Sequence, residues 1–170
     1  MKHRLIFIAL IALSVVALIS VALKTSSPAL ADGATQITGT AYFPGPGECT
    51  DAAYQDSDFS SILHGDMEGC IYTYVESAEC TPSGVYHESG HEVFVNADGG
   101  GTFRTTYFFQ AKYKDCPNLI NEVVGRCQHP IVDGSGTGVF EGVSGRLHFK
   151  DDIEEGNFPY QGHLNWVGSP

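Results

Sequence analysis

Basic side chains are scarce in this sequence. Nine Lys and Arg stand against twenty Asp and Glu in 170 residues, which gives a formal net charge of −11. After residue 31 the chain keeps all twenty acidic residues but only six basic ones, a net of −14. Phosphate backbones and anionic lipid surfaces are bound through clustered Lys and Arg. The composition therefore argues against nucleic acid and anionic membrane surfaces as partners.

Motifs of the common cofactor and catalytic sites are missing too. No two cysteines have the C-x-x-C spacing of a zinc knuckle or a thioredoxin-type centre. There is no phosphate-binding loop, no dinucleotide fingerprint and no Ser-His-Asp elbow. We therefore expect no cofactor and no bound metal.

One stretch spells the H-E-x-x-H zinc-protease motif, from His87 to His91. That chemistry needs both histidines on one face of a helix, with the glutamate beside the metal-bound water. A strand would still put His87 and His91 on one face but would turn Glu88 to the other. The surrounding residues favour a strand. On a strand the two histidines would be solvated side chains or, alternatively, would form a loose surface metal site. The residues that break or disfavour a helix here are Pro82, Gly84, Gly90, Val93 and Val95.

Helical periodicity is absent from the polar part of the chain, and strand patterns recur instead. The clearest is 102–114, where large apolar residues alternate with polar ones, as in a strand with one buried face. The other expected strands are 36–43, 64–76, 85–96, 120–132, 146–153 and 157–167.

This pattern predicts an all-β fold, a single closed antiparallel β-barrel of about eight strands. A flat sheet of that size would expose two long edges, and closure removes them. A two-sheet β-sandwich is the alternative. It needs crossing connections, and only the irregular segment 44–61 is long enough to make one.

The segment 85–96 could present either of two faces to the barrel lumen. Pointing Tyr86 and Phe94 inward also points Glu88 and Glu92 inward, whereas pointing the valines inward brings the histidines with them. We favour the first choice because aromatic side chains fill small barrels well. A buried carboxylate needs a partner or a raised pKa, and Arg126 is the candidate partner. A structural ion pair or a wet rim is the other interpretation. The further ligand-binding candidates in the lumen are Tyr107, Phe109, Tyr160 and Trp166.

The N-terminal segment has the features of an export signal. A basic start at residues 2–4 precedes the apolar run 5–23, and a polar spacer leads to the small-residue pattern Ala-Leu-Ala at 29–31. We expect cleavage after Ala31, which leaves 32–170 as one secreted barrel domain without a membrane segment. An uncleaved membrane anchor is the alternative, because the apolar run is long for a signal core.

Five cysteines follow this segment, and an oxidising compartment favours two disulfides with one thiol left over. Cys80 and Cys116 follow strands that run in the same direction, so they lie at the same end of a meander. We expect them to pair. Cys70 with Cys127 is the second expected bridge, which leaves Cys49 free.

A glycine-rich corner joins two strands near the C-terminal end of the chain. The stretch 136–145 reads G-T-G-V-F-E-G-V-S-G. It resembles the corner of the allene oxide cyclase and dirigent barrel superfamily, and the resemblance extends over 126–164. The resemblance implies an eight-stranded barrel with an apolar lumen, which in the plant enzymes holds an oxidised fatty acid, and related barrels form dimers and trimers. No catalytic motif of the family stands in this chain, so catalytic residues cannot be assigned.

Three functions fit these patterns. The first is a secreted barrel that binds a small apolar or amphipathic molecule in its lumen. The second is a cyclase or isomerase that uses an inward carboxylate, and the third is a solidly packed structural or surface barrel. Binding is favoured over catalysis, and a homo-oligomer is compatible with each. A ligand requires about 300 Å³ of connected lumen. The acidic run 151–155 lacks the spacing of a calcium loop and is expected to be a solvated hairpin tip.

Overall fold

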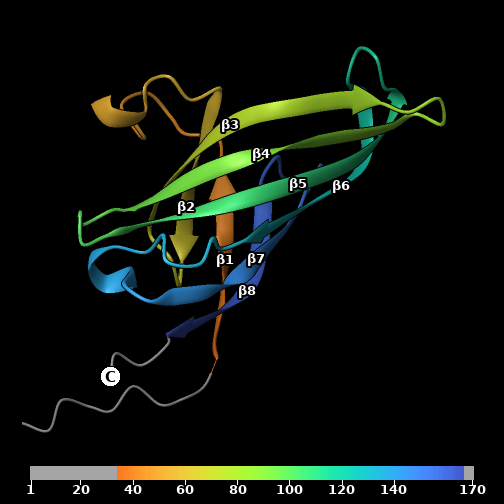
Figure 1. Cartoon of the computed structure of the whole chain (residues 1–170). Coiled ribbons are helices and arrows are strands. Elements are labelled where there is room, and N and C mark those ends of the chain that lie inside the picture. Colours follow the sequence, from red (N-terminus) through yellow and green to blue (C-terminus); the bar gives the residue numbers. More distant parts are fainter. Residues whose placement is uncertain (1–33, 167–170) are drawn as a thin grey trace, which may run out of the picture.

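The computed structural model describes residues 34–166 and shows eight antiparallel strands that close into one barrel (Figure 1). Each strand pairs with its neighbour in sequence, and β8 pairs with β1. No helix in this range is long and apolar enough to cross a membrane, and the expected export signal lies outside it. The strands are β1 (Thr35–Tyr42), β2 (Phe59–Gly65), β3 (Gly69–Cys80), β4 (Val85–Asn96), β5 (Thr102–Asp115), β6 (Ile120–Pro130), β7 (Val143–Lys150) and β8 (Phe158–Trp166), with 3-10 turns η1 (Ala52–Tyr54) and η2 (Gly138–Phe140).

The expected strand 64–76 is wrong, because it contains the end of β2 and the start of β3. A tight turn separates them between Gly65 and Gly69, whose φ angles are +126° and +154°. Residues with a Cβ rarely adopt such angles. Glu68 holds the turn by accepting the backbone N–H of Gly65 at 2.9 Å. The loop expected over 44–61 ends three residues earlier than predicted, because β2 begins at Phe59.

One end of the barrel is packed solid. Phe94 on β4 stacks on its cross-strand neighbour Phe103 on β5, with ring centroids 4.9 Å apart. Phe140 of η2 packs edge-on against both rings. On the β1–β2 side, Met67 enters the same core, and its backbone both donates to and accepts from the Tyr160 hydroxyl. The apolar alternation predicted for β5 and β8 thus forms this core.

The glycine corner after β6 requires glycine for close backbone approach. Gly145 has φ +128°, and a Cβ there would collide with the carbonyl oxygen of His163 on β8. Gly138 has φ +58°, and its Cβ would collide with the carbonyl oxygen of Gly100 in the β4–β5 turn. The corner can therefore lie directly on two neighbouring segments, which closes this end of the barrel.

One of the two expected disulfides forms. Cys80 and Cys116 are bonded, with Cα atoms 5.9 Å apart, at the ends of β3 and β5. The expected Cys70–Cys127 bridge is wrong: Cys70 is bonded to Cys49, and Cys127 is a buried free thiol. Alternation explains the error, since Ile71 faces the lumen and Cys70 therefore faces outward, whereas Cys127 faces inward.

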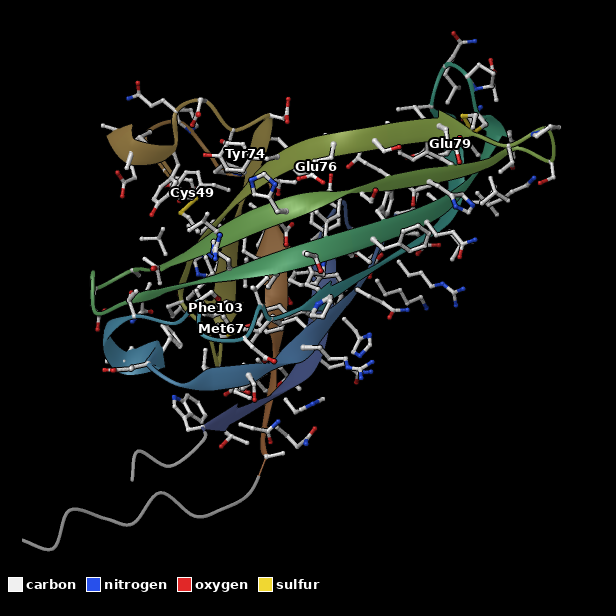
Figure 2. All side chains as sticks on the ribbon, in the orientation of Figure 1. Cys49, Met67, Tyr74, Glu76, Glu79 and Phe103 are labelled. Carbon is white, nitrogen blue, oxygen red and sulfur yellow. A yellow bond between two sulfur atoms is a disulfide. The ribbon has the colours of Figure 1, made fainter. Side chains whose placement is uncertain are left out.

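The loop between β1 and β2 covers the outer face of β3, which is why Cys49 meets Cys70 (Figure 2). Tyr54 of η1 stacks on Tyr72, with ring centroids 4.8 Å apart, and Tyr72 is only 3% exposed although it points out of the barrel. The Tyr72 hydroxyl also accepts the backbone N–H of Asp51 at 3.2 Å. The Cys49–Cys70 disulfide anchors this loop to β3. Together with the Cys80–Cys116 bridge it indicates an oxidising, extracytoplasmic environment.

Candidate functional site

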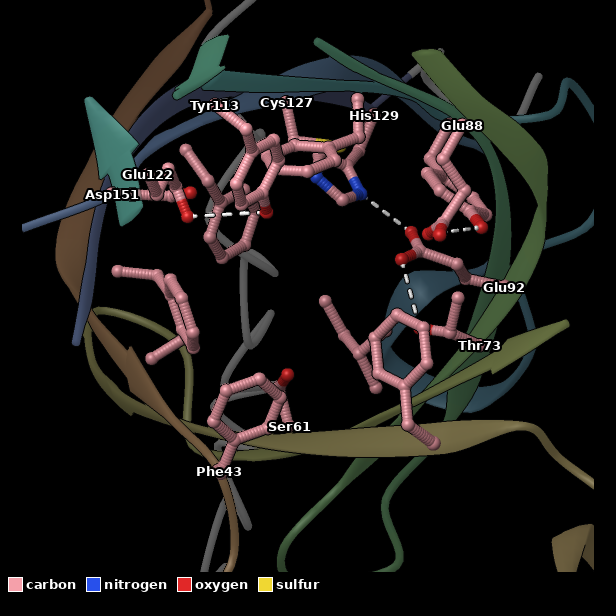
Figure 3. Close-up of a pocket in the computed structure, with 17 residues that line it drawn as sticks. Phe43, Ser61, Thr73, Glu88, Glu92, Tyr113, Glu122, Cys127, His129 and Asp151 are labelled. Carbon is pink, nitrogen blue, oxygen red and sulfur yellow. Dashed lines mark hydrogen bonds and ion pairs between the residues drawn. The ribbon is translucent and has the colours of Figure 1, made fainter. Parts of the chain in front are cut away.

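The barrel is hollow beyond its packed end. A cavity of about 330 Å³ occupies the lumen between β1–β3 on one side and β4–β8 on the other (Figure 3). Phe43 and Phe59 line it and are 64% and 39% exposed, so the cavity opens to solvent beside them. Its other apolar walls are Ala41, Ile71, Phe109, Phe149 and Phe158.

Glu92 supplies a buried carboxylate in the wall of this cavity. It is 3% exposed and lies on β4 at the same register level as Thr73 on β3 and Thr105 on β5. Both threonine hydroxyls donate to it, Thr73 to Oε1 at 3.1 Å and Thr105 to Oε2 at 2.7 Å. Side chains from three neighbouring strands thus satisfy both oxygens of one buried carboxyl group.

His129 completes this site from β6. Its Nδ1 lies 2.5 Å from Glu92 Oε2, and the residue is 6% exposed. Because the carboxylate accepts, the hydrogen-bond network assigns the proton to Nδ1. The ring packs between Phe149, with centroids 4.5 Å apart, and Tyr107, at 6.1 Å. Nε2 is buried and has no hydrogen-bond partner, and His129 lines the cavity.

Glu88 is the second lumen carboxylate on β4. It accepts the hydroxyl of Tyr86 at 2.5 Å and that of Tyr107 at 3.0 Å. Burial raises the pKa of Tyr107 well above its usual range, and the Glu88 charge adds to the effect. Burial, with the hydrogen bond to Glu88, does the same for the pKa of Tyr86. Both phenols therefore remain protonated donors at neutral pH.

A carboxyl pair, Glu122 on β6 and Asp151 after β7, lies across the lumen from Glu92 (Figure 3). Burial, and then hydrogen bonding and repulsion by Glu122, raise the pKa of Asp151 to about 8. Burial and the Glu122 charge likewise raise the pKa of Tyr113 to about 12, and its hydroxyl lies 3.3 Å from Glu122 Oε2. The pair thus holds one proton at neutral pH.

One expectation concerning this wall is therefore corrected. Asp151 was expected in a solvated hairpin tip, but its side chain is half-buried and faces the lumen, whereas Glu154 and Glu155 are exposed as expected. Glu122 faces the same cavity because a β-bulge shifts the register between β5 and β6, so that Tyr113 pairs with Glu122 while Lys112 pairs with Val124. Strict alternation would have turned Glu122 outward.

The structure brings four of the seven ligand-binding candidates together. Glu88, Glu92, Tyr107 and Phe109 line the cavity. The inward choice made for β4 is thus confirmed, with Tyr86 and Phe94 buried on the same face.

The other three candidates lie elsewhere. Arg126 as a partner for the carboxylates is wrong: it is exposed and donates to Gln110 Oε1 at 3.1 Å on the outer face, because Cys127 and His129 occupy the inner one. Tyr160 belongs to the packed end. Trp166 lies near η2, where its Nε1 donates to the Val139 carbonyl at 3.2 Å.

His129, Thr73 and Thr105 are the site residues that sequence reasoning missed. A signal for His129 was present, because it lies on the same face of its strand as Cys127. Without the register of β6 against its neighbours, however, the sequence did not show which face of this strand is buried. Cys127 also lines the cavity, and burial raises the pKa of its thiol well above the usual range, so it is protonated.

The residues of the H-E-x-x-H stretch lie on two opposite faces of β4, as a strand requires, with Glu88 inside the barrel and both histidines outside. His91 faces outward, where its Nδ1 lies 2.8 Å from Glu76 Oε1 and its ring stacks on Tyr74 at 4.9 Å. His87 packs on the outer face against Phe108. Over residues 34–166, no three His, Cys, Asp or Glu side chains form a group that could hold a metal ion.

The lumen therefore combines aromatic walls, a Glu92–His129 pair with one unpartnered nitrogen, and three further acidic side chains. Such a site can enclose a small molecule and exchange hydrogen bonds or protons with it. The chain matches no protein-family model, and neither the search of curated proteins nor that of solved structures gave a match.

Proposed function

We propose that this protein is a secreted binding barrel that holds a small apolar or amphipathic molecule in its lumen. The observation that carries the proposal is the cavity of about 330 Å³ behind the Phe94–Phe103 core. Its volume falls in the range of small-molecule sites, and it has the usual composition of such sites, mainly aromatic walls with a few converging polar groups. A barrel with a purely structural role would gain stability by filling this space, because empty volume in a core is destabilising.

Export fits this function. The two disulfides require an oxidising environment, and the apolar run at 5–23 followed by the Ala-Leu-Ala pattern is typical of a cleaved signal. The acidic surface keeps such a protein soluble. Membership of the allene oxide cyclase and dirigent barrel superfamily is part of the proposal, and the glycine corner at 136–145 supports it.

Native mass spectrometry of the protein purified from its own host tests the binding proposal. We expect an added mass that leaves on collisional activation. The matched variant is Ser61→Trp, which places an indole in the cavity from β2, and it should retain its melting temperature but lose the added mass. The proposal fails if the wild-type protein carries no added mass and also takes up no Nile red, a neutral apolar dye.

An isomerase or cyclase is the second candidate, and the Glu92–His129 pair favours it. A neutral imidazole oriented by a carboxylate through Nδ1 presents Nε2 as a proton acceptor, which is the arrangement of a general base. Cys127 is an unsuitable nucleophile because its thiol is protonated.

Chromatography of the molecules bound to wild type and to His129→Gln separates the two functions. An enzyme releases or retains product in the wild type and accumulates an isomeric substrate in the variant. A binding protein yields the same molecule from both. Recovery of the same molecule from both proteins would therefore contradict a catalytic function and support the binding function.

A further inference from the structure

We propose that the polar group of the lumen ligand is an organic ammonium ion, so that the barrel selects a protonated amphipathic amine over a carboxylic acid. This inference rests on the proposed binding function and specifies its ligand class. It follows from the charges of the cavity wall, from one unsatisfied buried atom and from the aromatic surroundings.

Most ionisable side chains of the wall are acidic. The residues that line the cavity include Glu88, Glu92, Glu122 and Asp151 but no Lys or Arg. Glu88 and Glu92 each accept two or more hydrogen bonds from the protein. Glu122 and Asp151 add a second pair of carboxyl groups, and burial raises the pKa of Asp151 to about 8. A ligand carboxylate would lose its hydration beside these groups without gaining a cationic partner, which opposes binding.

The unsatisfied atom requires a hydrogen-bond donor. His129 is 94% buried, Glu92 accepts its Nδ1–H, and its Nε2 has no hydrogen-bond partner. In the neutral ring that these contacts allow, Nε2 carries a lone pair. A buried polar atom left unpaired costs about 1–3 kcal/mol. An N–H group of a ligand would satisfy it, whereas a carboxylate has only lone pairs to offer.

The walls suit a cation as well as an apolar chain. Tyr107, Phe109 and Phe149 place aromatic rings in the cavity wall, and the His129 ring packs against those of Tyr107 and Phe149. Ring faces attract ammonium groups by cation–π interaction, which strengthens when the site excludes water. The carboxylates fix the charged end of the ligand, and the exposed phenylalanines Phe43 and Phe59 receive its apolar end at the mouth.

Three probes with the same phenylalkyl body test this: 4-phenylbutylamine, 4-phenylbutanol and 4-phenylbutyrate, measured by titration calorimetry at pH 7. We expect the amine to bind at least tenfold more tightly than the alcohol, and the carboxylate most weakly. Glu88→Gln, which removes the charge at nearly unchanged size and keeps one acceptor oxygen for the tyrosine hydroxyls, should weaken the binding of the amine about tenfold and leave that of the alcohol unchanged. Glu79→Gln is the control. Glu79 is exposed near the end of β3, and its replacement changes the net charge by the same amount as that of Glu88 (Figure 2).

Equal affinity for amine and alcohol would overturn the inference, since charge would then not contribute. Preference for the carboxylate, as a doubly protonated His129 would produce, would overturn it too. If Nile red binds the wild type but not Ser61→Trp while none of the three probes binds, the amine inference fails and the binding function stands. If Nile red does not bind either, and the protein from its own host carries no added mass, both fail.

Discussion

Removing the charge of Asp151 should stabilise the protein at alkaline pH. The free carboxyl group has a pKa near 3.8, whereas burial and Glu122 raise the pKa of folded Asp151 to about 8. Between these values the folded state holds a proton that the unfolded state has released. Stability contributed by this group is therefore full below pH 4 and falls as the pH rises to 8. Asp151→Asn removes the titration and with it the loss.

The size of the effect follows from the linkage of one proton. The free energy of unfolding can fall by at most about 1.4 kcal/mol for each pH unit between the two pKa values. Because the carboxyl group is half-exposed, solvent screening reduces this limit considerably. We expect the free energy of unfolding to fall between pH 5 and pH 8 by about 2 kcal/mol more in the wild type than in Asp151→Asn.

Urea denaturation of both proteins at pH 5, 6.5 and 8 measures this difference. Glu122→Gln should flatten the pH dependence only in part, because it removes the repulsion by Glu122 but leaves burial, the larger cause of the raised pKa of Asp151. Glu154→Gln makes the same change in net charge at an exposed site of the adjacent turn and should leave the dependence as in wild type. Identical pH dependence in wild type and Asp151→Asn would refute the shared proton and the lumen-facing position of Asp151.

Three further predictions concern the fold. Replacing both Cys80 and Cys116 by Ser opens a loop with a sequence separation of 36 and should lower the free energy of unfolding by about 3–4 kcal/mol in denaturant titrations; no loss would mean that the bridge is not formed. Gly145→Val should destabilise by at least ~1 kcal/mol and clearly more than Gly156→Val, whose Cβ meets no neighbour, and equal melting temperatures would contradict the corner geometry. The Cys127 thiol should react with Ellman's reagent only after unfolding, and rapid labelling of the native protein would show that it is accessible.

Local alternation in the sequence determined which face of most strands is buried. In 102–114 the apolar residues recur every second position, and these are the ones that enter the barrel. The same period, with Tyr86 and Phe94 as anchors, placed Glu88 and Glu92 in the lumen. Strand direction in a simple meander also predicted the Cys80–Cys116 bridge. The buried face depends on residues close in sequence, so one chain segment suffices to predict it, and the bridge depends only on the order and direction of successive strands.

Register and irregular backbone decided the rest. His129 on β6 bonds to Glu92 on β4, and these two strands are not neighbours in the sheet. The pair therefore depends on which side chains meet inside the lumen. Glu122 turns inward only because of the β5–β6 bulge. The loop that carries Cys49 folds over the outer face of β3, which alternation within any strand cannot reveal. These contacts join residues far apart in sequence, and the total pairing and packing energy of the closed barrel selects them, whereas the two-residue period of a single strand says only which side chains share a face.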